Sequence, residues 1–140
     1  MMNVIYTILC RDIDAQLSFY QAMFGWQEAT RYRSPIFRAL QADNLLFGFH
    51  APMARTLLNL EDASVGVPGD GGFPTIEMPC FEEVDATAAR VGTLNGTLVK
   101  APFVTYYGQW QAVLRDPEQN LFRTASLHLP PGIIASPITF

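Results

Sequence analysis

Few side chains in this chain of 140 residues have the chemistry of a catalytic or metal-binding group. The two histidines, His50 and His128, each lie near the end of a strand-like stretch, and we interpret them as partly exposed strand-end residues. Cys10 and Cys80 each follow an apolar stretch without a nearby histidine. Buried packing is therefore favoured over nucleophilic chemistry for both thiols, and a disulfide between them stays open. No Ser-His-Asp arrangement, phosphate loop or zinc-type cysteine spacing is present in the sequence, so catalytic residues are left unassigned.

The candidate binding residues are aromatic side chains with one arginine and one glutamate. Core packing explains any single aromatic residue, but the set exceeds what a small core needs, and flat ligands stack on such sets. Arg123 is the sharpest candidate, because a guanidinium among apolar groups needs an anion. That anion could be a ligand carboxylate or phosphate, or Glu77; a structural Arg123–Glu77 pair and a solvent-facing Arg123 are equally open. The predicted ligand-binding residues are Tyr6, Phe47, Phe49, Glu77, Phe103, Tyr106, Trp110 and Arg123, with Phe37 and Phe122 as further candidates.

The elements that position these residues occur twice in the chain. Asp14 precedes Gly25 by the same distance as Asp85 precedes Gly96, and each aspartate lies just after a short apolar run that leads into a cysteine. A period of about seventy residues in a chain of this length indicates two copies of one supersecondary unit. Two such units facing each other would form a cleft that suits a small molecule.

The first unit is predicted to contain one helix and four strands. Val4 to Leu9 favours a strand, Asp12 or Asp14 can cap the helix that follows, and Gly25 can end that helix in a left-handed conformation. Further strands are expected at Trp26 to Arg33, Pro35 to Gln41 and Leu45 to His50, with a turn at Ala42-Asp43-Asn44. The order is βαβββ.

The second unit repeats this order. Its helix has an apolar face at Val84, Ala88 and Val91, and Gly108 is expected to supply a turn with positive φ. Its strands are expected at Thr75 to Cys80, Leu98 to Tyr106, Trp110 to Arg115 and Asn120 to Leu127. We therefore divide the chain into a first module (1–50), a linker (51–72), a second module (73–129) and a C-terminal tail (130–140).

Composition excludes several classes of partner. The net charge is −4 and the basic residues are scattered, which disfavours nucleic-acid binding. No stretch is long and apolar enough to span a membrane, and the N-terminus lacks a signal-peptide pattern. With only two cysteines, we expect a cytoplasmic protein with reduced thiols.

Two motifs carry a resemblance to a known family. The segment Cys10-x-Asp12-x-x-x-x-Leu17-x-Phe19-Tyr20-x-x-x-Phe24-Gly25-Trp26 and the turn Asp116-Pro117-Glu118-Gln119-Asn120 resemble signatures of the vicinal oxygen chelate superfamily. Gln119 stands where that turn usually has glycine. The superfamily holds glyoxalase I, the bleomycin-resistance proteins and the extradiol dioxygenases. The resemblance implies an α+β fold of two tandem βαβββ modules forming a curved half-barrel sheet around a cleft, and a homodimer.

The resemblance also implies metal-ligand positions on the first and last strands of each module. Carried over to this sequence, these positions fall on Ile5, Phe47, Ile76 and Arg123. The first three have no donor atoms for a divalent ion, and a permanent cation at the fourth would repel it. A slip of one residue would bring in Tyr6, Glu77 or Phe122, and still no histidine. We therefore expect no metal and no cofactor.

Three functions follow as hypotheses. The first is a metal-free protein that binds an aromatic or hydrophobic small molecule, similar to the bleomycin-resistance branch, with drug or metabolite sequestration as its use. The second is a metal-dependent lyase or dioxygenase of the glyoxalase or extradiol type. The third is a regulatory or protein-interaction module that keeps only the fold. Apolar and cationic residues at the ligand positions favour the first.

Overall fold

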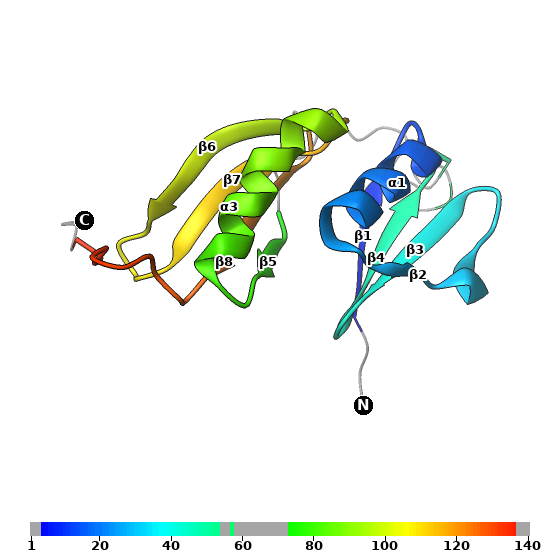
Figure 1. The fold of residues 1–140 in the computed structure, drawn as a ribbon. Coiled ribbons are helices and arrows are strands. Elements are labelled where there is room, and N and C mark those ends of the chain that lie inside the picture. The colour runs from blue at the N-terminus through cyan, green and yellow to red at the C-terminus, as the bar shows by residue number, and fades with distance from the viewer. Residues whose placement is uncertain (1–3, 54–56, 58–72, 137–140) are drawn as a thin grey trace. The chain divides into compact units, whose positions relative to one another are not determined.

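The computed structural model describes residues 4–53, 57 and 73–136 (Figure 1). The chain divides into two compact units, Met1–Val65 and Gly66–Phe140. Most of the expected linker (51–72) and the last four residues of the expected tail lie outside the described residues. No helix among the described residues is long and apolar enough to cross a membrane.

The first unit has the βαβββ order that the sequence predicts. It runs β1 (Ile5–Leu9), α1 (Ile13–Phe24), β2 (Gln27–Glu28), a short 3₁₀ helix η1 (Thr30–Tyr32), β3 (Phe37–Ala42) and β4 (Leu45–His50). The strands form one sheet in the order β1-β4-β3-β2, in which β1 and β4 are parallel and the other neighbours are antiparallel. The helix provides the crossover that a parallel pair of strands requires.

Capping groups fix both ends of α1. Asp12 Oδ1 accepts a hydrogen bond from the backbone N–H of Ala15 at 3.0 Å, which satisfies one of the free donors at the start of the helix. Gly25 ends the helix with φ +70°, and its N–H donates to the Gln21 carbonyl at 2.8 Å. Of the two expected capping aspartates, Asp12 is therefore the cap.

The core of the first unit lies between α1 and one face of its sheet. Tyr20 of α1 is buried, and its ring lies 4.8 Å from the ring of Phe47 and 5.5 Å from that of Phe49. Leu17 and Met23 are buried on the same helix. Full burial of such side chains contributes roughly 1.5–3 kcal/mol each, so this aromatic layer is a main source of stability for the unit.

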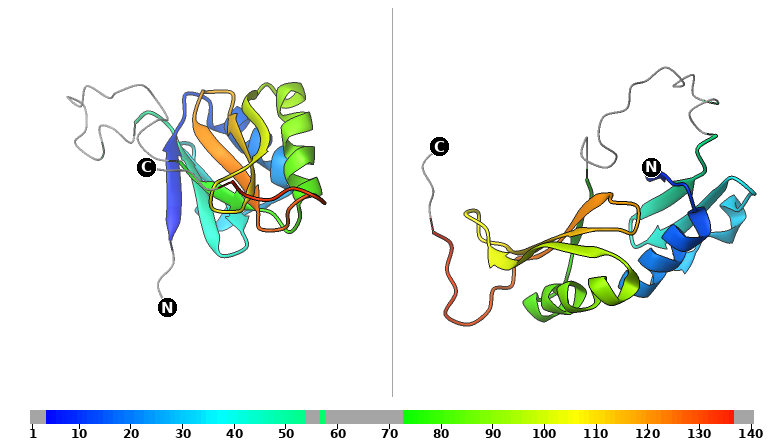
Figure 2. Two further views of the ribbon diagram at one scale, coloured as in Figure 1. Left: turned by 90° about the vertical axis from the view of Figure 1, so that its left-hand side faces the viewer. Right: turned by 90° about the horizontal axis from the view of Figure 1, so that it is seen from above.

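The second unit repeats the topology. It runs β5 (Thr75–Glu77), α3 (Phe81–Arg90), the 3₁₀ helix η2 (Val91–Leu94), β6 (Thr97–Val104), β7 (Trp110–Arg115) and β8 (Leu121–Ser126). The sheet order is β5-β8-β7-β6, with β5 and β8 parallel. In each unit the helix lies on one side of its own sheet, as Figure 2 shows from two further directions.

Helix α3 packs on its sheet through both apolar and polar contacts. Val84 and Thr87 are fully buried, and the Thr87 hydroxyl lies 2.9 Å from the hydroxyl of Thr124 in β8. Thr87 Oγ1 also donates to the Val84 carbonyl at 2.8 Å, so Thr124 can donate to Thr87 and the buried hydroxyls are satisfied. Beyond η2 the chain turns at Asn95, which has φ +67°, rather than at one of the neighbouring glycines.

Several strands are shorter than the sequence predicts. The strand expected at Trp26 to Arg33 is only β2, because η1 folds the chain back and brings Arg33 to Glu28. The strand expected to run from Thr75 to Cys80 ends at Glu77, because Pro79 has no N–H to extend the ladder. β6 ends at Val104, because Thr105 begins the turn in which Gly108 has φ +88°.

Candidate functional site

The two faces of the second sheet have different surroundings. In β8, Phe122 and Thr124 are fully buried, and Thr124 contacts α3. Side chains alternate along a strand, so Arg123 lies on the opposite face, which we call the open face of unit 2 because α3 lies on the other side of the sheet; Gln111 and Ala125 on this face are nevertheless buried. Strand pairing places a further set of residues on this face, namely Thr75, Glu77, Phe103, Gln111, Val113 and Ala125.

Arg123 is held on the open face by neutral groups. It lies opposite Thr75 in the parallel β5–β8 pair, and its Nε donates to Thr75 Oγ1 at 3.0 Å. Its Nη1 lies 3.5 Å from the Tyr107 hydroxyl, at the outer limit of a hydrogen bond. The guanidinium carbon lies 4.8 Å from the centre of the Phe73 ring, which places the cation against an aromatic face.

Within the described part of the chain, Arg123 has no carboxylate partner. Glu77 lies opposite Ala125, one alternation beyond the Thr75–Arg123 pair, and no ion pair joins Glu77 to Arg123. The structural pair that the sequence left open is therefore absent. The half-buried guanidinium has polar and aromatic neighbours but no neutralising charge.

Tyr107 connects Arg123 to the next strand. Gln111 of β7 is buried, and its Nε2 donates to the Tyr107 hydroxyl at 3.0 Å. Because the same oxygen faces Arg123 Nη1, the hydroxyl accepts from both sides. Tyr107 and Gln111 are not among the ligand-binding residues that the sequence predicts, and alternation along β7 and β8 is the signal that could have found Gln111.

Three of the eight predicted ligand-binding residues lie on the open face of unit 2, and a fourth lies beside it. Glu77, Phe103 and Arg123 are on this face, where Lys100 Nζ lies 3.7 Å from the centre of the Phe103 ring. Tyr106 lies in the turn after β6, half exposed, with its ring edge-on to that of Tyr107 at 4.9 Å. The turn therefore presents two adjacent tyrosines, of which Tyr107 reaches Arg123.

The structure places the other four predicted residues on the helix-facing sides. Phe47 and Phe49 are buried against Tyr20 of α1, and Tyr6 packs on Phe47 with ring centres 5.5 Å apart. Burial raises the pKa of the Tyr6 hydroxyl. Trp110 lies opposite Ser126, and its Nε1 donates to Asp85 of α3 at 2.8 Å. Packing and tethering of the helices account for these side chains. The further candidate Phe122 is also buried on the helix side.

The strand register shows on which face of its sheet each implied metal position lies. Phe47 and Ile76 face the helices, because Phe47 contacts Tyr20 and Ile76 pairs with Thr124. Ile5 pairs with Leu46 in the first sheet as Thr75 pairs with Arg123 in the second. The residues at the equivalent positions on the faces opposite the helices are therefore Ile5, Leu46, Thr75 and Arg123.

In neither unit do the residues at these positions fit a divalent metal ion. Two of these residues are aliphatic, one is a neutral hydroxyl and one is a cation, whereas such ions take imidazole, carboxylate or thiolate donors. The next position in β4 has no room for a ligating side chain, because a Cβ on Gly48 would lie 2.8 Å from the Phe37 ring and 2.9 Å from Thr7 Oγ1. Among the described residues, no three His, Cys, Asp or Glu side chains are grouped to hold a metal.

The histidines and cysteines have local structural roles. His50 Nδ1 lies 2.9 Å from the Ala51 carbonyl and its ring packs edge-on against Phe37. His128 packs on Phe81, with its Nδ1 3.9 Å from Glu82 Oε2. Cys10 is buried and Cys80 is partly buried, and the two are not joined by a disulfide.

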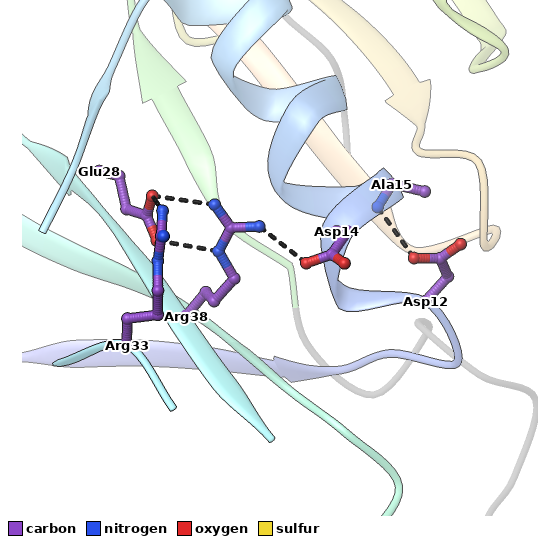
Figure 3. A network of polar contacts seen from close by, with 6 residues as sticks. All are labelled: Asp12, Asp14, Ala15, Glu28, Arg33 and Arg38. Atoms are coloured by element: carbon purple, nitrogen blue, oxygen red, sulfur yellow. Dashed lines mark hydrogen bonds and ion pairs between the residues drawn. The ribbon is translucent and has the colours of Figure 1, made fainter. Parts of the chain in front are cut away.

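A charged network in the first unit has no signature in the sequence (Figure 3). Arg38 of β3 binds Glu28 through two hydrogen bonds of 2.8 and 2.9 Å, and its Nη1 binds Asp14 of α1 at 2.7 Å. Arg33 also binds Glu28. Hydrogen bonds from Arg38 and then Arg33 lower the pKa of Glu28 to about 2. The network joins α1 to the sheet and is a stabilising feature of the unit.

The sequence matches a family model over nearly its whole length. The match to the Glyoxalase/Bleomycin resistance protein/Dioxygenase superfamily covers residues 4–124. The chain belongs to this superfamily. No curated protein matches it.

Solved structures agree with this membership. A glyoxalase/bleomycin resistance protein/dioxygenase family enzyme from Burkholderia phytofirmans PsJN is 38% identical, with a TM-score of 0.83 over 88% of this chain and 96% of that chain. Two further structures share the fold. The hypothetical protein SA1046 from S. aureus is 18% identical, with a TM-score of 0.73 over 90% of this chain and 94% of that chain. A lactoylglutathione lyase from Agrobacterium tumefaciens is 16% identical, with a TM-score of 0.68 over 89% of this chain and 92% of that chain. The same paired βαβββ fold therefore occurs in a lactoylglutathione lyase and in a hypothetical protein, so function must be argued from the site.

Proposed function

We propose that this member of the glyoxalase superfamily is a metal-free protein that binds a small, flat organic molecule. The observation that carries the proposal is the position of Arg123. It lies opposite Thr75 at the strand pair where the superfamily resemblance places two metal ligands, and a neutral hydroxyl with a permanent cation is a poor replacement for a histidine and a carboxylate.

The surroundings of Arg123 support binding rather than a purely structural role. A structural arginine is usually neutralised by a carboxylate, as Arg38 is by Glu28 and Asp14 in the first unit. Arg123 instead lies among Thr75, Tyr107 and Phe73. Phe73 is 43% exposed and Tyr107 is 48% exposed. A flat ligand can therefore stack on their rings, and such stacking contributes to affinity.

Metal content separates this function from a metal-dependent lyase or dioxygenase. The purified protein should contain only a substoichiometric amount of any divalent metal after dialysis without chelator, as measured by inductively coupled plasma mass spectrometry. Loading with Zn²⁺, Ni²⁺, Mn²⁺ or Fe²⁺ should leave the midpoint of thermal unfolding unchanged, since a specifically bound ion stabilises the folded state. One tightly bound equivalent of metal would establish the metal-dependent alternative instead.

Ligand binding separates the proposal from a regulatory or protein-interaction module. A ligand present at a hundred times its dissociation constant adds about 2.7 kcal/mol to the free energy of unfolding. A thermal-unfolding screen with flat aromatic molecules of different charge should therefore contain compounds that raise the midpoint. A screen in which neither anionic, neutral nor cationic aromatic compounds do so would favour the interaction module.

The proposal includes a homodimer, which the superfamily resemblance implies. Light scattering coupled to gel filtration should give twice the mass of one chain. A monomer that still binds ligand would remove the dimer from the proposal and leave the binding function in place.

A further inference from the structure

We propose that the ligand is an aromatic carboxylate, whose carboxylate binds Arg123 and Tyr107 on the open face of unit 2. This inference rests on the proposed function and narrows it to one chemical class. It follows from the donors that remain around Arg123 once the contacts within the unit have been assigned.

The cluster has more hydrogen-bond donors than acceptors. Arg123 uses Nε for Thr75 and directs Nη1 toward Tyr107, and its Nη2 has no acceptor among the residues that the structure describes. The Tyr107 oxygen receives Gln111 Nε2 at 3.0 Å as well as Arg123 Nη1 at 3.5 Å. An oxygen that accepts from both sides directs its own proton elsewhere, so the tyrosine is left as a donor next to the guanidinium.

Thr75 adds a third donor to the cluster. Its hydroxyl oxygen accepts from Arg123 Nε at 3.0 Å, which leaves the hydroxyl proton available. Thr75 is exposed, so a ligand can reach it. Arg123 Nη2, the Tyr107 hydroxyl and the Thr75 hydroxyl are thus three donors around one cation, and within the described residues no carboxylate lies near enough to form an ion pair with that cation. Such a set is complementary to an anion with two oxygens.

The aromatic side chains decide what the anion is attached to. Phe73 packs against the guanidinium with its ring 43% exposed, and the Tyr107 ring is 48% exposed. Phe103 lies on the same face, opposite Gln111. A bare inorganic anion would accept hydrogen bonds from the donors and leave these aromatic surfaces in contact with water. A carboxylate attached to an aromatic ring would accept the same hydrogen bonds, and its ring could stack on the exposed aromatic faces.

Glu77 also lies on the open face, opposite Ala125 and two residues along β5 from Thr75. Its charge is unfavourable for a second anionic group on the ligand. The arrangement therefore favours a ligand with a single carboxylate at the Arg123 end over a dicarboxylate.

Three matched probes test the chemical class by isothermal titration calorimetry with the full chain. They are 2-naphthoate, 2-naphthamide and acetate, which carry ring and charge, ring alone and charge alone. We expect 2-naphthoate to bind at least about tenfold more tightly than either of the others, a difference of about 1.4 kcal/mol. Equal binding of naphthoate and naphthamide would overturn the carboxylate assignment while leaving the proposed binding function intact. Equal binding of naphthoate and acetate would overturn the aromatic part.

Three variants test the residues. Arg123→Gln should lower naphthoate affinity by about tenfold or more and leave naphthamide affinity unchanged, because only the ion pair is lost. Arg31→Gln removes the same charge from an exposed side chain of η1 and should change the affinity for neither naphthoate nor naphthamide.

Tyr107→Phe retains the aromatic ring and leaves the Arg123 guanidinium in place, so it remains informative if the Arg123 variant does not fold. It should weaken naphthoate binding severalfold. Unchanged naphthoate binding in a folded Arg123→Gln or in Tyr107→Phe would contradict the site.

Discussion

Trp110 Nε1 donates a hydrogen bond to Asp85 Oδ1 at 2.8 Å, which ties the third strand of the second module to its helix. The first module has the same tether with different chemistry, because Asp14 binds Arg38 at 2.7 Å. Arg38 lies opposite Phe49 and Trp110 lies opposite Ser126, in the last strand of each module. The aspartate repeated in the sequence therefore joins helix to sheet in both modules.

A double-mutant cycle tests this role for the second module. Trp110→Phe and Asp85→Ala should each lower the free energy of unfolding, and their coupling should be about 0.5–1.5 kcal/mol, the usual net value of one hydrogen bond. Urea unfolding at neutral pH measures all four proteins. Additive losses would show that the bond contributes nothing to stability.

The same variant separates tethering from ligand binding. Trp110 was expected from the sequence to line the site, but it faces α3. Trp110→Phe should therefore leave the calorimetric affinity for 2-naphthoate within about twofold of the original protein, a difference of about 0.4 kcal/mol. A tenfold loss of affinity in a folded Trp110→Phe protein would place the indole back in the site.

The charged network in the first module predicts a specific dependence of stability on pH. The pKa of Glu28 is lowered from 4.5 to about 2 on folding, so its contribution is fully present above about pH 5 and is lost as the pH falls toward 2. Glu28→Gln should cost about 1–3 kcal/mol at pH 7, and the difference from the original protein should shrink between pH 5 and 2. Urea unfolding across this range measures it.

Arg38 and Arg33 provide the matched comparison. Arg38 binds both Glu28 and Asp14 and is 19% exposed, whereas Arg33 binds Glu28 alone and is 53% exposed. Arg38→Gln should therefore destabilise the protein more than Arg33→Gln, because exposed ion pairs contribute little. Equal costs at pH 7, or a Glu28→Gln difference that stays constant down to pH 2, would refute the network's role.

The turn before β8 contains a residue in an unfavourable backbone conformation. Gln119 has φ +73°, where a side chain is costly and glycine is not. Gln119→Gly should raise the free energy of unfolding by up to about 1 kcal/mol, since relief of strain outweighs the greater freedom of the unfolded chain. Thermal unfolding measures the change. Asn95→Gly, at φ +67°, should gain less because asparagine tolerates this region. A Gln119→Gly protein less stable than the original would contradict this assignment of strain.

Sequence reasoning was most successful where turn chemistry fixes the ends of strands. β4 and β7 begin and end where the sequence predicts, because Asp43-Asn44 and Asp116-Pro117 break the chain beside them. The βαβββ order and the Gly25 terminus were likewise predicted, and the cap was narrowed to Asp12 or Asp14, of which Asp12 is the one observed. These features depend on neighbours in the chain.

The candidate site was harder to predict because it depends on strand faces and long-range pairing. A shift of one residue moves a side chain to the other face of a sheet, and the sequence alone did not show that Phe47 and Ile76 lie on the helix-facing sides of their sheets. The Thr75–Arg123 contact joins residues 48 apart in the chain. Tyr107 reaches Arg123 from a turn, which no periodicity specifies.

The most direct test of a metal-free binding function is the affinity for 2-naphthoate measured by calorimetry before and after exhaustive dialysis against EDTA, with Zn²⁺, Ni²⁺, Mn²⁺ or Fe²⁺ then added back. Because Arg123, Tyr107 and Thr75 supply the proposed contacts, we predict the same affinity in all samples and a loss of about tenfold or more in Arg123→Gln. Binding that disappears with EDTA and returns with a divalent metal would contradict the account.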